Sequence, residues 1–108
     1  MSKTLSTHVL DAVSGDPAVD VAVRVESGGA VVASGRTDDD GRIATLADAP
    51  LPAGTYRIVF DSGEYFERSG TDHFYPEVIV TFRSDGSGRG YHVPILLSPF
   101  AYSTYRGS

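Results

Sequence analysis

The sequence predicts an all-β domain, a sandwich or barrel of about eight short strands with one short helix. Apolar and polar residues alternate with a period of two in several segments, which is typical of half-buried strands. The 108 residues include 12 Gly and 6 Pro, so many turns are expected. Turn-forming clusters separate the alternating segments along the whole chain.

Four segments show the clearest alternation. In the segment 19–26, valines 19, 21, 23 and 25 share one face while polar or small residues share the other. In the segment 91–97, His92 lies on the face opposite Tyr91 and Val93. The strands predicted on this ground are Val19–Glu26, Thr55–Phe60, Glu77–Arg83 and Tyr91–Leu97. Weaker patterns predict four more strands, at Leu5–Leu10, Ala30–Ser34, Arg42–Leu46 and Ala101–Tyr105.

The connections contain recognisable turn and helix signals. Gly28-Gly29 predicts a hairpin turn in which both residues take positive φ, and a further turn is expected at 38–41. The segment 61–70 predicts a short helix. We expect Asp61 to cap its N-terminus, Glu64 to reach back as in a capping box, and Gly70 to end it.

Composition excludes several classes of function. The net charge is −5 and the nine basic residues are scattered, so we expect no nucleic-acid partner. The chain lacks cysteine, which excludes thiolate nucleophiles and favours a reducing compartment. No apolar run approaches membrane-spanning length and no signal-peptide core is visible, so we expect no membrane partner and a cytoplasmic location. Without a linker or repeat, residues 1–108 are expected to form one domain.

The three histidines are the first candidates for acid–base chemistry, because imidazole titrates near neutral pH. His8 and His92 each lie within a predicted strand, on the face opposite their valine neighbours. Taken alone, this pattern favours two half-exposed histidines with satisfied hydrogen bonds over a catalytic pair. His73 lies in a loop and is interpreted as a surface residue. No third ligand occurs at a zinc-motif spacing, so we expect no metal site.

Two further regions offer polar groups. Arg42 follows the 38–41 turn, either as a solvated arginine or as a guanidinium that stabilises an oxyanion. The C-terminus ends in Tyr105, Arg106, Gly107 and Ser108. This tail fits either a polar edge strand or a segment folded into a site, with the carboxylate of Ser108 as a contact.

Three sequence blocks together resemble the 5-hydroxyisourate hydrolases, the enzymatic branch of the transthyretin-related family. The first two are Leu-Ser-Thr-His-Val-Leu-Asp at 5–11, followed by Gly-Asp-Pro-Ala at 15–18, and Thr-Asp-Asp-Asp-Gly-Arg at 37–42. The third runs from Tyr-His-Val-Pro at 91–94 into the terminal Tyr-Arg-Gly-Ser at 105–108, which is the family's enzymatic signature. The resemblance spans essentially the whole chain.

The resemblance implies a transthyretin-like two-sheet β-sandwich with a helix between the fifth and sixth strands. It implies hydrolysis of 5-hydroxyisourate to 2-oxo-4-hydroxy-4-carboxy-5-ureidoimidazoline in urate degradation, without a cofactor. It places His8, Arg42 and His92 in the active site as catalytic residues, with Tyr105 to Ser108 as substrate contacts. It also implies a homotetramer built as a dimer of dimers, with sites in a channel across the subunit interface. Where the family often has a further histidine, this chain has Gly90.

Two alternative functions remain open at this stage. The first is a transthyretin-like carrier that binds a small ligand without chemistry. Hormone-carrying transthyretins are similar in fold but lack the His/Arg/His set and the terminal tetrapeptide, both of which this chain has. The second is an immunoglobulin-like structural module, which the absence of cysteines and of a signal peptide disfavours.

Overall fold

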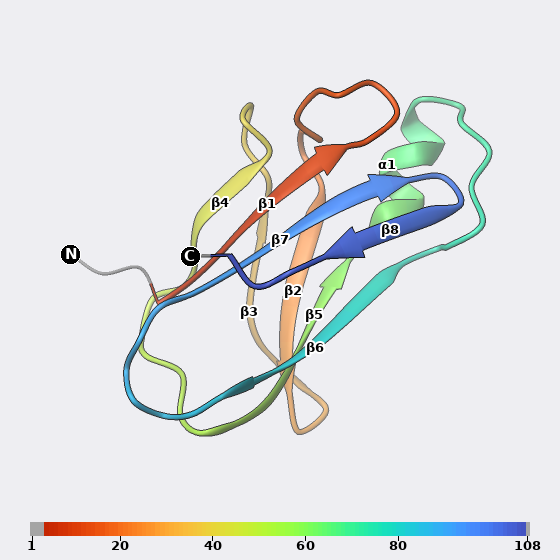
Figure 1. Cartoon of the computed structure of the whole chain (residues 1–108). Coiled ribbons are helices and arrows are strands. Elements are labelled where there is room, and N and C mark those ends of the chain that lie inside the picture. The colour runs from red at the N-terminus through yellow and green to blue at the C-terminus, as the bar shows by residue number, and fades with distance from the viewer. Residues whose placement is uncertain (1–3, 108) are drawn as a thin grey trace.

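A computed structural model of the chain describes residues 4–107, which form eight strands and one helix in two four-stranded sheets (Figure 1). One sheet has the order β4-β1-β7-β8 and the other the order β3-β2-β5-β6. The predicted sandwich is thereby confirmed, with the helix between the fifth and sixth strands. The elements are β1 (Leu5–Asp11), β2 (Ala22–Ser27), β3 (Ala30–Arg36), β4 (Arg42–Ala47), β5 (Gly54–Phe60), α1 (Ser62–Arg68), β6 (Val78–Ser84), β7 (Tyr91–Ser98) and β8 (Ala101–Thr104).

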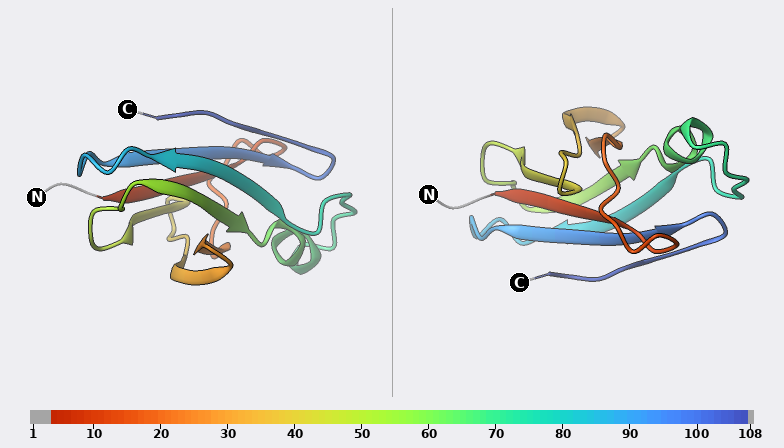
Figure 2. Two further views of the ribbon diagram at one scale, coloured as in Figure 1. Left: turned by 90° about the horizontal axis from the view of Figure 1, so that it is seen from below. Right: turned by 90° about the horizontal axis from the view of Figure 1, so that it is seen from above.

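The core lies between the two sheets, which Figure 2 shows as separate layers with α1 at one end. Alternate residues of β1, β2, β5 and β7 point inward, so that Val9, Val25, Ile58 and Ile95 are almost completely buried. Burying an aliphatic side chain of this size contributes about 1.5–3 kcal/mol. The inward-facing set of β1 is Leu5, Thr7 and Val9, so the alternate set on that strand faces out of the sandwich.

The alternation predicted from residue 19 begins later than expected. Val19 is 39% exposed, and β2 starts only at Ala22. Between them, Asp20 takes a φ of 62°, in the left-handed region that few non-glycine residues adopt. This kink removes Val19 from the face that Val21 and Val23 share, so placing it on the buried face was wrong.

The helix confirms two of its three predicted signals. The Asp61 carboxylate accepts a hydrogen bond from the Glu64 amide at 3.4 Å, and Gly70 ends the helix region with a φ of +66°. The reciprocal half of the capping box is wrong. The Asp61 amide donates to the Ala22 carbonyl at 2.9 Å instead, and the Glu64 carboxylate is bound by Arg36 at 2.8 Å.

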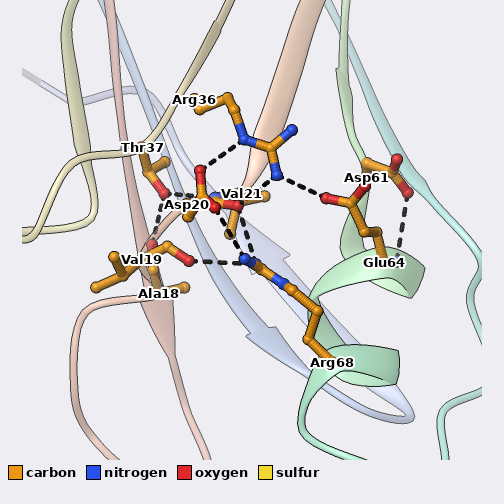
Figure 3. A network of polar contacts seen from close by, with 9 residues as sticks. All are labelled: Ala18, Val19, Asp20, Val21, Arg36, Thr37, Asp61, Glu64 and Arg68. Atoms are coloured by element: carbon orange, nitrogen blue, oxygen red, sulfur yellow. Dashed lines mark hydrogen bonds and ion pairs between the residues drawn. The ribbon is translucent and has the colours of Figure 1, made fainter.

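The side chains of two arginines converge on Asp20 and tie the helix to the sheet (Figure 3). Arg36 reaches its carboxylate at 2.6 Å from the end of β3, and Arg68 reaches it at 3.1 Å from α1. Arg68 also donates to the Asp20 backbone carbonyl at 2.9 Å. The hydrogen bond from Arg36 is the main reason why the pKa of Asp20 lies below its ordinary value. This network joins the kinked segment to the end of β3 and to α1.

Candidate active site

The three residues predicted to be catalytic come from three adjacent strands of one sheet, β4, β1 and β7 (Figure 1). His8 pairs with Arg42 across the antiparallel β1–β4 ladder. Two residues earlier on β1, Ser6 pairs with His92 across the parallel β1–β7 ladder. Paired residues, and residues two apart on a strand, share a face of the sheet. All four side chains therefore lie on the outer face, opposite the buried Thr7 and Val9.

The turn at 38–41 positions Arg42 on this face of the sheet. The Asp38 carboxylate accepts hydrogen bonds from the amides of Asp40 and Arg42, each at 2.9 Å. The bond from the Arg42 amide is the main reason why the pKa of Asp38 lies below its ordinary value. Gly41 takes a φ of +74°, and a side chain there would overlap the Val9 carbonyl oxygen. Arg42 thus leaves a rigid turn with its side chain exposed.

A β-bulge beside Arg42 opens a pocket on the outer face. Leu5 pairs with Ala47 and Thr7 with Ile43, so two steps along β1 correspond to four steps along β4. Bulges of this kind separate strands locally and are common beside active sites. The resulting pocket has a volume of about 320 Å³. Its lining residues are Ser6, Thr7, Arg42, Ala44, Gly90, Tyr91 and His92.

The imidazole of His92 is contacted on both of its edges. Its Nδ1 lies 2.9 Å from the Ser6 hydroxyl oxygen. Its Cδ2 lies against Gly107, so close that a side chain on that glycine would overlap it. The Gly107 amide also donates to the His92 carbonyl at 2.8 Å. The C-terminal tail therefore folds back from β8 onto the start of β7, where it flanks the ring.

A second, more apolar pocket of about 360 Å³ lies between this tail and β6. Thr104 anchors the start of the tail by donating to the Pro94 carbonyl at 2.8 Å. Tyr105 is 59% exposed, and the following Arg106 is exposed as well. His92 lines both pockets and so forms part of the wall between them. The lining residues are Val80, Phe82, Arg83, Tyr91, His92, Val93, Thr104, Tyr105 and Arg106.

The structure brings most, though not all, of the predicted site residues together. Arg42 and His92 line one pocket, whereas Tyr105 and Arg106 line the neighbouring pocket beyond His92. His8 is half-buried on the same face beside Arg42, but it lines neither of these pockets. Ser108 lies outside the described residues.

His73 lies apart from this constellation, in the loop that follows α1. Its Nδ1 is 3.0 Å from the Thr71 carbonyl oxygen, and its ring stacks on Phe66 with centroids 5.9 Å apart. Within residues 4–107, no group of three or more His, Asp or Glu side chains is placed to hold a metal ion.

Sequence reasoning missed Ser6, whose hydroxyl oxygen lies 2.9 Å from Nδ1 of the His92 ring. Its position two residues before His8 places both on one strand face, which was visible in the sequence. The contact itself depends on the parallel register between β1 and β7, which joins residues 86 positions apart. Local alternation carries no information about such a register.

A family model, related sequences and solved structures all point to the same family. A family model described as the HIUase/Transthyretin family matches residues 5–107. A 5-hydroxyisourate hydrolase of Salmonella typhi is 45% identical over 112 residues, covering 99% of this chain and 82% of that protein. The structure of Klebsiella pneumoniae 5-hydroxyisourate hydrolase superposes with a TM-score of 0.90 at 40% identity, covering 98% of this chain and 94% of that one.

A sea bream transthyretin in complex with thyroxine is also similar, with a TM-score of 0.87 at 37% identity. That alignment covers 96% of this chain and 94% of the transthyretin chain. Because hydrolases and a thyroxine-bound transthyretin share this fold, the fold alone does not separate an enzyme from a binding protein. The distinction has to come from the side chains of the site.

Proposed function

The chain belongs to the HIUase/Transthyretin family, and from this premise we propose that it hydrolyses 5-hydroxyisourate to 2-oxo-4-hydroxy-4-carboxy-5-ureidoimidazoline in urate degradation. One observation carries the proposal: Arg42 and His92 line a single pocket of about 320 Å³, with His8 on the same sheet face. This volume lies within the range of small-molecule sites. The Arg42 guanidinium can stabilise negative charge on a substrate oxygen, and the two imidazoles can accept and donate protons.

The proposed reaction adds water to a lactam carbonyl and breaks its carbon–nitrogen bond. An imidazole of the His8–His92 pair accepts a proton from water as the water oxygen attacks the carbonyl carbon. Arg42 donates hydrogen bonds to the carbonyl oxygen, where negative charge develops. As the bond breaks, the departing ring nitrogen takes a proton from the imidazolium, and the carbonyl carbon ends as a carboxyl group. General-base assistance contributes about 10²–10⁴-fold to such a step.

We assign the terminal residues Tyr105, Arg106, Gly107 and Ser108 to substrate contact and to the closure of the pocket. The fold of the tail onto His92 through Gly107 supports this assignment. Tyr105 and Arg106 follow Thr104 along the side of His92 that faces the second pocket. A phenol and a guanidinium at this place suit a planar substrate rich in carbonyl and N–H groups.

The reaction uses water and acid–base groups and, in this proposal, needs no cofactor. We also propose a cytoplasmic location, which the absence of cysteine from the chain supports. Among residues 4–107, no helix has the length and apolar character needed to cross a membrane.

We propose that the chain assembles as a homotetramer, a dimer of dimers in which the outer faces of β4-β1-β7-β8 sheets oppose one another. The strands β6 and β8 are edges of their sheets, and all four residues of β8 are exposed. Large apolar side chains near β8 support an interface there, since Phe74 is 71%, Phe100 65% and Tyr102 44% exposed. Sedimentation should give a mass four times that of the 11.5 kDa chain, and a monomer at micromolar concentration would contradict the assembly.

One assay distinguishes the hydrolase from a carrier, the alternative that the similarity to a thyroxine-bound transthyretin favours. Freshly generated 5-hydroxyisourate is followed by ultraviolet absorbance with and without the protein. Faster decay is expected, and His92→Ala should reduce the acceleration by about 100-fold or more. Binding of the compound without faster decay would identify a carrier and contradict the proposal, as would the absence of both effects.

A further inference from the structure

We propose that Ser6 is a positioning residue for the hydrolysis, an inference that rests on the proposed function. Its hydroxyl holds the His92 imidazole by Nδ1, so that Nε2 at the tip of the ring is the nitrogen that exchanges a proton with water or substrate. Ser6 itself lines the pocket between Arg42 and His92 and is half-buried there.

The backbone fixes where Ser6 lies. Seven consecutive residues of β1 pair in register with seven of β7, from Leu5 with Tyr91 to Asp11 with Leu97. The Thr7 hydroxyl, which is buried, donates to the Val93 carbonyl at 2.7 Å and locks this register one residue beyond Ser6. Ser6 therefore faces His92 because of the sheet, and its own hydroxyl is not needed to keep the strands together.

The bulge between β1 and β4 exposes the Ser6 side chain to the pocket. The β4 pairing passes from Leu5 to Thr7 without an aligned partner for Ser6. Ser6 lines the pocket, and its hydroxyl oxygen lies 2.9 Å from Nδ1 of His92.

Contacts on two edges of the imidazole favour one orientation of the ring. Nδ1 and Cδ2 are both bonded to Cγ and lie on opposite edges, so the ring has Ser6 on one edge and Gly107 on the other. A half-turn about the Cβ–Cγ bond would place a carbon atom against the Ser6 oxygen and lose the hydrogen bond. It would also exchange Nε2 for Cε1 at the tip. The Ser6 hydroxyl therefore favours the orientation that presents a nitrogen at the reacting position.

The test replaces Ser6 by Ala and measures turnover together with the ring ¹⁵N resonances of His92. Removing one hydrogen bond of this kind predicts a kcat lower by about two- to tenfold, with KM nearly unchanged. The Nδ1 resonance should move, because its partner is gone, and Ser6→Thr, which keeps a hydroxyl, should restore both values. Ser98→Ala is the matched control, since its hydroxyl bonds Ala101 at 3.0 Å at the far end of β7.

Two results would overturn the inference. An unchanged Nδ1 resonance in Ser6→Ala would show that the hydroxyl does not hold the ring. A moved resonance with wild-type kcat would show that the contact does not serve the reaction. The proposed function is tested by a different measurement. If the wild-type protein does not accelerate the decay of 5-hydroxyisourate, the proposed function fails, whatever the His92 resonance does in Ser6→Ala.

Discussion

At the scale of single residues, Gly107 shows how closely the tail and the imidazole fit. Its amide bonds the His92 carbonyl, and a methyl group on its α-carbon would overlap Cδ2 and lie 3.1 Å from Cγ of the ring. Either the ring or the tail would have to move to admit that methyl group. Because acid–base catalysis depends on the position of the imidazole, a small displacement should be visible in turnover.

We therefore expect Gly107→Ala to lower kcat by up to about 100-fold, the loss that a misplacement of about 1 Å can cause. Gly35→Ala is the control, because its added methyl group would meet Ile43 at 3.5 Å, an ordinary contact. Deletion of residues 105–108 should impair turnover as well. A Gly107→Ala protein with wild-type kcat would show that the tail does not position the ring.

The types of the site residues could be predicted from sequence, whereas their contacts could not. His8, Arg42 and His92 were identified by side-chain chemistry and by resemblance, and the structure places all three on one sheet face. The contact of Ser6 with His92 was missed, because a serine in a strand has many uses and nothing local distinguishes this one. The role of each residue in turnover stays a prediction.

At the scale of elements, the 38–41 turn sets the position of Arg42. Gly41 combines a left-handed φ of +74° with close contact to the Val9 carbonyl, whereas Gly28 has a φ of +59° and no atom within 4 Å of an added side chain. Substitution by alanine therefore adds only backbone strain at Gly28, but both backbone strain and steric overlap at Gly41. Both conformations cost an alanine about 1–2 kcal/mol, and overpacking adds about 1–3 kcal/mol at Gly41 alone.

Gly28→Ala should accordingly lower the free energy of unfolding by about 1–2 kcal/mol, and Gly41→Ala by about 2–5 kcal/mol. Urea denaturation of the two variants measures both values. Gly41→Ala should in addition reduce turnover, since Arg42 follows the distorted turn. Equal losses of stability in the two variants would contradict the tight packing of the turn against β1.

The network around Asp20 joins the segment before β2, the end of β3 and α1, and it has a pH dependence of defined sign. The pKa of Asp20 is lower in the folded protein than its ordinary value of 3.8. The ionised carboxylate thus stabilises the fold above that value, and this contribution is lost as the pH falls through the lowered folded-state pKa.

Asp20→Asn removes the charge while keeping a residue type that tolerates left-handed φ. We expect it to be less stable than the wild type at pH 7, with a difference in unfolding free energy that shrinks as the pH falls below about 4. Urea denaturation at pH 7 and pH 3 measures this difference. Asp39→Asn is the control, because Asp39 forms no ion pair within residues 4–107. A difference that stays constant down to pH 3 would contradict the account.

Elements were more predictable than their boundaries and caps. The Gly28-Gly29 hairpin formed as expected, with φ values of 59° and 82°, because two glycines meet the needs of the turn locally. The Glu64 half of the capping box failed because Arg36, distant in sequence, competes for that carboxylate. Val19 was misplaced because Asp20 takes a φ of 62°, and alternation carries no sign of such a kink.

At the scale of the whole molecule, alternation predicts about eight strands in a sandwich or barrel, whereas it does not predict the strand order. Periodicity indicates which side of a strand is buried, so much of the core could be predicted. The choice of a two-sheet sandwich came from the resemblance. The parallel pairing of β1 with β7 joins the first strand to the seventh, and no local pattern encodes it. The resemblance to a known family implied a two-sheet sandwich but gave no strand order, so this pairing, on which the site depends, came from the structure.

The central claim is that three side chains on the outer face of β4, β1 and β7 carry out the hydrolysis of 5-hydroxyisourate. Its most direct test is kcat/KM for Arg42→Ala, His8→Ala and His92→Ala, with urea denaturation to verify folding. These residues face outward, so all three variants should fold, and each should lose about 100-fold or more in kcat/KM. Wild-type kcat/KM in all three folded variants would contradict the claim.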